Sequence, residues 1–203
     1  MANRATLGCF AAIVLAIVVI ALGAIGTYNR LVALDQAVQA QWAQVENVYQ
    51  RRADLIPNLV QTVKGVANFE KSTYIAVAQA RAKVGQVQAS VPPNITNDPQ
   101  AFTKFQAAQD GLTSALSRLL VVVERYPDLK ANENFLQLQS QLEGTENRIA
   151  VERMRYNEVA QQFNTTRQSF PTVFFANFFG ERFKSKAYFQ AQPGAQTAPK
   201  VQF

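Results

Sequence analysis

The densest group of ionisable side chains lies between residues 143 and 158. Its members are Glu143, Glu146, Glu152, Glu158, Arg148, Arg153 and Arg155. Paired carboxylates can carry out general acid and base catalysis, and buried glutamates can hold metal ions in helical bundles. Glu152 falls on an apolar stripe between Ile149 and Tyr156, where an ionised carboxylate needs a partner. No second carboxylate lies on that stripe, so we interpret Glu152 as a residue that fixes helix register or a subunit contact.

The composition of the chain excludes several kinds of active site. Its 203 residues include no His and one Cys. Catalytic sets that depend on His are therefore absent, and so are the Glu-x-x-His pairs of ferritin-like metal bundles. The sequence also has no P-loop and no Gly-rich turn between a strand and a helix. We predict a protein without enzymatic activity, with no catalytic residue, no metal and no cofactor.

A second polar group, Arg51, Arg52 and Asp54, stands beside Pro57. We interpret this group as a joint between two helices, and one hypothesis makes it a contact point for a partner or a neighbouring subunit. The alternative is structural: Asp54 caps a helix, and the arginines form ion pairs with glutamates on an adjacent helix.

Aromatic and basic residues gather near the C-terminus. Phe174, Phe175, Phe178 and Phe179 recur at spacings that give a helix one aromatic face, and Arg182, Lys184 and Lys186 follow. The rings could close the end of the core or pack on a neighbouring protomer. The interpretation we favour is an interfacial helix, whose rings enter the acyl boundary while the cations meet lipid phosphates.

Helices must position these groups, and the first helix of the chain is predicted to cross a membrane. Residues 5–29 carry no charge, and their large apolar side chains include Leu7, Ile13, Ile17, Ile20 and Ile25. A helix of this length spans the hydrocarbon core of about 30 Å. The apolar run is longer than that of a cleaved signal peptide, so we predict an uncleaved anchor over residues 1–29. A positive-inside count favours a cytoplasmic N-terminus by only one charge.

Residues 30–168 show the apolar spacing of long helices. Apolar side chains recur three and four residues apart, and Pro or Asp-Pro sequences interrupt the pattern near residues 92, 99, 127 and 171. Pro57 allows either one kinked helix from Arg30 to about Gln88 or a break at residues 51–54. The break gives four rods of comparable length, so we predict an up-and-down four-helix bundle of long helices. The fourth helix then returns to the bilayer, followed by an aromatic and basic segment and a Gln/Pro-rich tail over residues 169–203.

The charges are unevenly distributed along the chain. Residues 31–163 hold 13 basic and 13 acidic side chains, so the whole net charge of +6 lies outside the predicted bundle. This distribution favours a lipid surface and argues against nucleic acid as a partner. The chain also contains 22 glutamines, and we place many of them on helix exteriors, including Gln36, Gln39, Gln44, Gln106, Gln109, Gln137, Gln141 and Gln161. A surface of uncharged amides has little self-repulsion, so we expect a homo-oligomer.

Several blocks of the chain closely resemble the LemA family. The first are YNRLV at residues 28–32 and VENVYQRRADLIPNLV at 45–60, and the longest later block is ERYPDLKANENF at 124–135. Shorter matches follow at 145–149, 155–157, 170–171, 179–180 and 187–189. The resemblance implies a bacterial protein with one N-terminal transmembrane helix and a bundle of four long helices. It also implies a small external N-terminus with a cytoplasmic domain, opposite to the charge count, and it implies no reaction.

The resemblance and the residues together lead to one functional prediction. Some members of the family lie in gene clusters for magnetosome membranes, which implies a role in membrane organisation. We predict an all-α, single-pass protein of the bacterial inner membrane that assembles with itself and scaffolds membrane-associated partners. The alternative is an adaptor or regulatory subunit of a membrane protease or phosphatase, held by a membrane protein partner.

Overall fold

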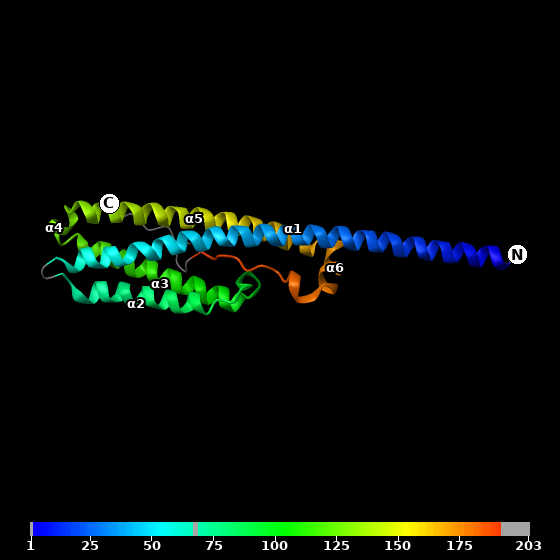
Figure 1. The fold of residues 1–203 in the computed structure, drawn as a ribbon, viewed down its shortest axis with the longest axis horizontal. Coiled ribbons are helices and arrows are strands. Elements are labelled where there is room, and N and C mark those ends of the chain that lie inside the picture. Colours follow the sequence, from blue (N-terminus) through cyan, green and yellow to red (C-terminus); the bar gives the residue numbers. More distant parts are fainter. Residues whose placement is uncertain (1, 67–68, 192–203) are drawn as a thin grey trace, which may run out of the picture.

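The computed structural model describes residues 2–66 and 69–191, with side chains from Leu7 onward. Within these residues every element is helical (Figure 1). The long helices are α1 (Ala2–Lys64), α2 (Lys71–Ala89), α3 (Pro99–Val123) and α5 (Glu133–Gln168). The short ones are η1 (Ile95–Asn97), α4 (Pro127–Lys130), α6 (Thr172–Phe178) and η2 (Gly180–Phe183). The tail predicted after Gln190 lies outside the described residues from position 192 on.

Helix α1 joins the predicted membrane segment to the bundle. All five residues named for the span, Leu7, Ile13, Ile17, Ile20 and Ile25, are exposed, whereas Leu31 is fully buried. The N-terminal part of α1 projects beyond the other helices, as Figure 1 shows. Among the described residues, α1 is the one helix long and apolar enough to cross a membrane. The prediction of an all-α fold with one apolar N-terminal helix is confirmed.

The break predicted at residues 51–54 is wrong, because α1 continues through them to Lys64. The 3-4 spacing runs unbroken from Tyr49 through Arg52 to Ile56 and Leu59, and all four side chains are buried. Arg52 therefore occupies a core position of a continuous helix. Arg51 is exposed on the same helix, and Asp54 accepts a hydrogen bond from Gln50 Nε2 (2.8 Å) in place of capping a new helix.

Pro57 lies inside α1, where its missing N–H leaves the carbonyl of Ala53 without its helical partner. Arg81 of α2 fills this vacancy, since its Nε donates to Ala53 O at 3.1 Å. The proline is tolerated because the neighbouring helix supplies the donor that the backbone lacks.

The first turn of the bundle falls at Gly65 and not at Pro57. Gly65 follows the last residue of α1, and its N–H still donates to Gln61 O (3.2 Å) where the helix ends. The kinked single helix to Gln88 is therefore also wrong, although the resulting bundle still has four rods. The other predicted joints are present: Asp98 accepts from Gln100 N (2.9 Å) and Ala101 N (3.0 Å), with Pro99 in the first turn of α3.

The bundle is packed as two close helix pairs, α1 with α5 and α2 with α3. Its core divides into two clusters along the rod. The cluster nearer the membrane segment is aromatic, with Trp42 against Phe102, Phe105 and Tyr156 at ring-centroid distances of 5.5, 5.3 and 5.6 Å. The distal cluster is mainly aliphatic and includes Leu59, Leu112, Leu119 and Leu142.

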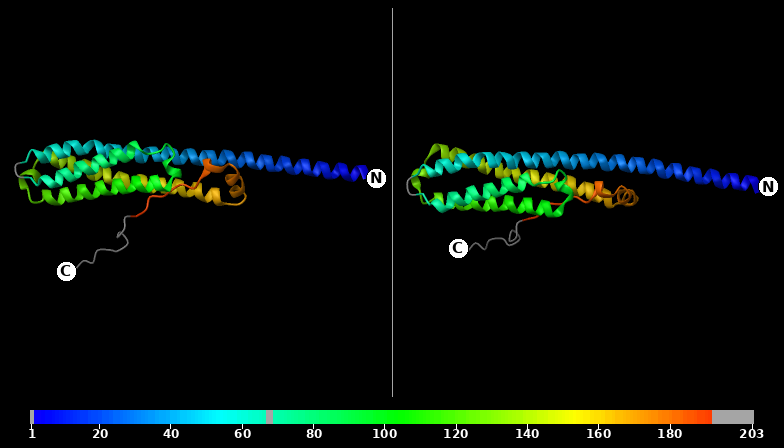
Figure 2. Two further views of the ribbon diagram at one scale, coloured as in Figure 1. Left: turned by 90° about the horizontal axis from the view of Figure 1, so that it is seen from below. Right: turned by 60° about the horizontal axis from the view of Figure 1, so that its bottom comes forward.

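The chain after α5 turns back onto the bundle. Helix α6 lies beside α1 and the end of α5, and residues 184–190 then run as an extended segment along the bundle (Figure 2). We call residues 184–190 the strap. Because α5 ends beside the start of the bundle, the segment after it lies next to the projecting part of α1.

Candidate functional site

Helix α6 is fixed to α1 just beyond the predicted membrane segment. The Tyr28 ring packs edge-on against Phe179 and Phe183, with centroids 5.0 and 5.6 Å away. Arg182 NH1 donates to Tyr28 Oη at 2.6 Å. Tyr28 is three residues from Ile25, so these contacts place α6 at the end of the exposed apolar part of α1.

The aromatic residues of this segment divide into an inner and an outer set. Phe175 and Phe179 are half-buried, whereas Phe174 and Phe178 are 66% and 85% exposed. Phe170 is 81% exposed and its ring centroid lies 5.9 Å from that of Phe174. We call Phe170, Phe174 and Phe178 the ring ridge. The helical spacing missed Phe170 because Pro171 separates it from α6, and only the exposed position of its ring reveals it.

The basic residues of the segment also separate. Arg182 and Lys184 are exposed, and Lys184 pairs with Glu181. Lys186 was expected at the membrane surface, but its side chain is fully buried and forms an ion pair with Asp35 of α1. Its Nζ also donates to Asn97 Oδ1 at 2.6 Å. Lys186 is therefore unable to meet lipid, because the strap carries it into the bundle.

Side-chain amides bind the main chain of the strap. Asn164 accepts from Lys186 N (2.8 Å) and donates to Lys186 O (3.0 Å), and Asn157 makes the same pair of bonds with Phe189 N (2.9 Å) and O (3.0 Å). Seven helical residues and three extended residues both rise about 10 Å, so the two amides match the spacing of an extended chain. At the end of the strap, Gln190 O accepts from Gln106 of α3 (2.8 Å) and Arg153 of α5 (3.0 Å).

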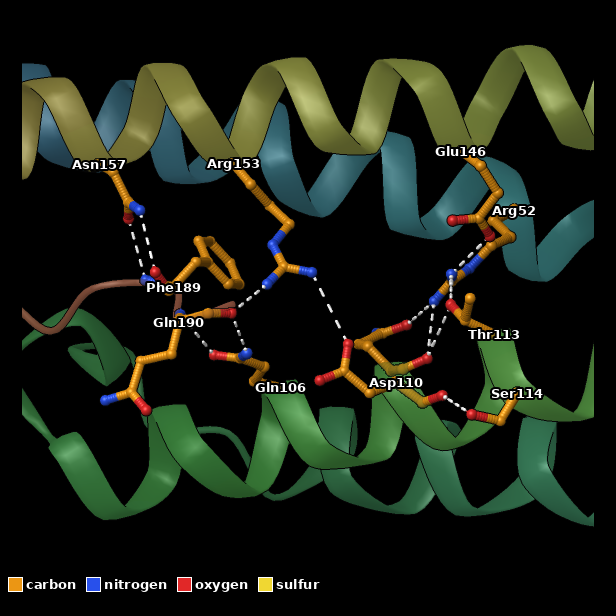
Figure 3. Close-up of polar contacts among 11 residues, drawn as sticks. Arg52, Gln106, Asp110, Thr113, Ser114, Glu146, Arg153, Asn157, Phe189 and Gln190 are labelled. Carbon is orange, nitrogen blue, oxygen red and sulfur yellow. Dashed lines mark hydrogen bonds and ion pairs between the residues drawn. The ribbon is translucent and has the colours of Figure 1, made fainter. Parts of the chain in front are cut away.

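Arg52 connects α1 to α3 and α5 in the middle of the bundle. Its NH1 donates to Thr113 Oγ1 at 2.8 Å and to Glu146 Oε1 at 2.7 Å, and its NH2 donates to Gln109 Oε1 (Figure 3). Only 1% of the side chain is exposed, which excludes it from a surface contact with a partner. The ion pair with Glu146 agrees with the structural interpretation of Arg52, in which the arginine pairs with a glutamate on an adjacent helix. Gln109, expected on the exterior, is buried because it fills a core position between Phe105 and Leu112.

A cleft of about 280 Å³ adjoins this network between α3 and α5. Tyr49 and Arg52 line it from α1, Asp110 from α3, and Ile149 and Arg153 from α5. Arg153 NH1 lies 3.7 Å from Asp110 Oδ1 across the cleft, as Figure 3 shows. Tyr49 Oη and Arg52 Nε are buried without a hydrogen-bond partner in the described part of the chain. Both atoms are enclosed within the wall of the cleft, so neither donor is presented at its surface.

Burial controls the titration of the two core tyrosines. Desolvation raises the pKa of Tyr49 to about 12, although the nearby guanidinium groups of Arg153 and Arg52 act in the opposite direction. Burial also raises the pKa of Tyr156, whose hydroxyl donates to Ala187 O at 3.0 Å. Both phenols are thus neutral donors at physiological pH, and neither is an activated nucleophile or base.

Glu152 lies at the edge of the core, with 16% of its side chain exposed. It accepts hydrogen bonds from Gln41 Nε2 at 2.6 Å and Arg155 NH1 at 2.9 Å. These bonds supply the partners that an ionised carboxylate on the stripe requires. Because Gln41 belongs to α1, Glu152 helps to hold α5 in register with α1, as one of the two interpretations of this residue expects.

The sequence matches one protein family and several named proteins. A sequence model of the LemA family matches residues 41–203. The chain is 28% identical over 184 residues to magnetosome protein MamQ 2 of Paramagnetospirillum magneticum, covering 84% of this chain and 67% of that protein. Magnetosome protein MamQ of Magnetospirillum gryphiswaldense matches with the same identity and shares. Protein LemA of Metamycoplasma hominis is 26% identical over 148 residues, or 73% of this chain and 63% of that protein.

Proposed function

Because the chain belongs to the LemA family, we propose that it is a non-enzymatic, membrane-anchored helical bundle that assembles with itself and organises partners at the bilayer. The observation that carries this proposal is the continuity of α1, which runs without a linker from the exposed apolar segment into the core of the bundle. A junction of this kind holds the bundle at a fixed position relative to the membrane. The proposal places the chain in the bacterial cytoplasmic membrane as a single-pass protein.

The ring ridge gives the bundle a second contact with the bilayer in this proposal. Phe170, Phe174 and Phe178 point away from the core beside the end of the apolar part of α1. Exposed phenylalanines at that level bury their rings in the acyl boundary, and Arg182 and Lys184 then lie near lipid phosphates. Two attachments to one surface restrict the tilt of a rod more than one anchor does, and this supports a role in which the bundles line up side by side.

Self-association is supported by the neutral charge of the bundle. The equal numbers of basic and acidic residues between positions 31 and 163 leave little net repulsion between parallel rods. The similarity to two magnetosome proteins supports the role in membrane organisation that the family resemblance implies.

The size of the purified complex tests the proposed function. We expect the full chain in mild detergent to form a large symmetric particle, measured by light scattering and native mass spectrometry. A monomer held by a different protein would support an adaptor for a membrane protease or phosphatase and contradict the scaffold. Protease accessibility in intact spheroplasts assigns the side of the membrane on which the bundle lies.

A further inference from the structure

The seam between α3 and α5 is filled over only part of its length. Nearer the membrane segment, the strap lies in it, and the main-chain oxygen of Gln190 is bound there by Gln106 of α3 and Arg153 of α5 (Figure 3). Farther along, the backbones of α3 and α5 make few close approaches. The strap therefore ends partway along a seam that continues toward the distal end of the bundle.

An apolar pocket of about 370 Å³ lies in the unfilled part of the seam. Its apolar lining consists of four leucines, Leu59, Leu116, Leu120 and Leu142. Glu143 and Glu146 also line it and, among the described residues, no basic side chain does. Glu146 is paired with Arg52, whereas Glu143 is exposed and accepts from the neutral amide of Gln139 (2.9 Å). The pocket thus suits an apolar group with a positive charge beside it.

The strap runs toward this pocket. Lys186 donates to Asn97 just before α3, and Gln190 is bound by Gln106, nine residues farther along the chain. The strap therefore follows α3 in the direction of Leu120. The rise of α3 from Gln106 to Leu120 is about 21 Å. A chain that continues beyond Gln190 in the same direction reaches the pocket within that distance.

The sequence after the strap carries the groups that the pocket suits. Between the strap and Lys200 it contains only Ala, Gln, Pro, Gly and Thr residues. Val201 is then the first large apolar residue, and Phe203 falls on the same face of an extended chain. The eleven residues from Gln190 to Val201 span up to about 36 Å when extended, which exceeds the required rise of roughly 21 Å.

We propose that residues 200–203 close the α3–α5 seam of their own chain. Val201 and Phe203 enter the pocket beside Leu120, and Lys200 forms an ion pair with Glu143. The chain after α6 then joins α3 to α5 in the distal half of the bundle, where these two helices make few contacts of their own. The pocket is filled by the chain itself, whether or not the bundles assemble with one another.

Disulfide formation on the full chain in mild detergent tests the proposal. In a Cys9→Ser background, Ser117→Cys places a thiol beside the pocket, and Gln202→Cys places one between the two apolar residues. Neither substitution removes a group that the proposed contact uses. Under a copper–phenanthroline oxidant, we expect an intramolecular disulfide, identified by mass spectrometry of the unreduced protein.

The matched control pairs Ser72→Cys with the same Gln202→Cys substitution. Ser72 is exposed, as Ser117 is, but it lies on α2 and lines a cavity between α2 and α3. Arg118 lines the same cavity, so Ser72 and Ser117 lie at a similar level of the rod on different sides of α3. We expect the Ser117 pair to form its disulfide at least tenfold faster than the Ser72 pair.

Further substitutions in the Ser117 pair separate the apolar contact from the charged one. We expect Phe203→Ser to slow disulfide formation at least fivefold, whereas Thr197→Ser leaves the rate unchanged. Lys200→Glu should also slow it, and adding Glu143→Lys should restore at least half of the original rate. Thermal unfolding by circular dichroism verifies that each variant is folded.

Three results would overturn the proposal. Equal rates for the Ser117 and Ser72 pairs would show that the segment has no preference for the seam. A covalent dimer on a non-reducing denaturing gel, in place of the intramolecular disulfide, would show that the segment enters a neighbouring copy. An unchanged rate in Phe203→Ser would show that the disulfide reflects only the length of the connecting chain.

Discussion

Arg52 holds three helices together through one planar guanidinium group. Its NH1 donates hydrogen bonds to Thr113 of α3 and Glu146 of α5, and its NH2 donates one to the buried side-chain oxygen of Gln109. A buried charge of this kind is tolerated only because its partners come from other helices. Arg52 therefore specifies how α1, α3 and α5 are aligned, beyond any contribution to the apolar core.

The first prediction concerns the removal of this guanidinium. We expect Arg52→Met to lower the free energy of unfolding by about 2–4 kcal/mol, because the buried Gln109 amide and the Glu146 carboxylate lose their donor. Arg51→Met is the control, since Arg51 is exposed on the same helix and its loss should change stability by less than about 0.5 kcal/mol. Urea unfolding of the two variants in the same detergent measures the difference. Equal stability of the two variants would contradict a structural role for Arg52.

The second prediction concerns Tyr49 at high pH. Its pKa is raised to about 12 in the folded chain, whereas the pKa of a tyrosine in an unfolded chain is near 10.0. The unfolded state therefore loses the proton first, so the stability contributed below pH 10 is lost as the pH rises from 10 to 12. The loss amounts to about 2–3 kcal/mol over this range.

Tyr49→Phe isolates that contribution from the other groups that titrate at high pH. We expect the unfolding temperature of the wild type to fall more steeply above pH 10 than that of the Phe variant. Parallel curves for the two proteins would show that Tyr49 titrates normally.

At the scale of elements, α1 combines an anchor, a core helix and a proline. The carbonyl of Ala53 that Pro57 leaves unpaired is bonded by Arg81, so α2 compensates for a defect in α1. The same bond ties α1 to α2 across the first turn of the bundle.

The third prediction is a double-mutant cycle between these two positions. We expect Arg81→Ala to destabilise the wild type by about 1 kcal/mol, because Ala53 O then lacks a protein donor. In a Pro57→Ala background the backbone N–H of residue 57 donates to Ala53 O, and the cost of Arg81→Ala should fall to near zero. Urea unfolding of the four proteins measures the coupling. An equal effect of Arg81→Ala in both backgrounds would contradict the compensation.

At the scale of the whole molecule, the apolar part of α1 and the ring ridge lie at the same end of the rod. Trp42, the single tryptophan, is 17 residues beyond Ile25, about 25 Å along α1. Residues 31–163 of the bundle carry no net charge, while the basic residues Arg30, Arg182 and Lys184 lie toward the membrane end. These three basic residues therefore lie where an anionic surface would meet them.

The fourth prediction locates the ring ridge relative to lipid. In liposomes that contain brominated lipid, we expect the emission of Phe178→Trp to be quenched more strongly than that of the wild type, whose Trp42 lies in the core. Leu136→Trp places the same side chain at the distal end of the bundle, and its quenching should match the wild type. Equal quenching of Phe178→Trp and Leu136→Trp would show that the ridge faces away from the bilayer.

The features that have local causes can be predicted from the sequence alone. The charge-free run of residues 5–29 defines the apolar helix, Asp98-Pro99 starts α3, and Pro127 follows its end. Each of these depends on the backbone chemistry or side-chain hydrophobicity of a few neighbouring residues. The 3-4 spacing of apolar residues continues through Arg52 and Gln109 and indicates that both are core positions. Their polarity instead suggested a helix joint at Arg52 and an exterior position for Gln109.

Which polar and aromatic side chains are buried depends on contacts between helices. Arg52 is buried because it pairs with Glu146 of α5, and Lys186 is buried because it pairs with Asp35 of α1. Gln109 is buried because Arg52 donates to its side-chain oxygen. The phenylalanines near α6 divide by whether α1 covers them, since Phe179 packs on Tyr28 whereas Phe174 and Phe178 are exposed. The strap lies between α3 and α5 as far as Gln190. The free energy of burying a polar group depends on partners brought close by folding, and no spacing along one helix records them.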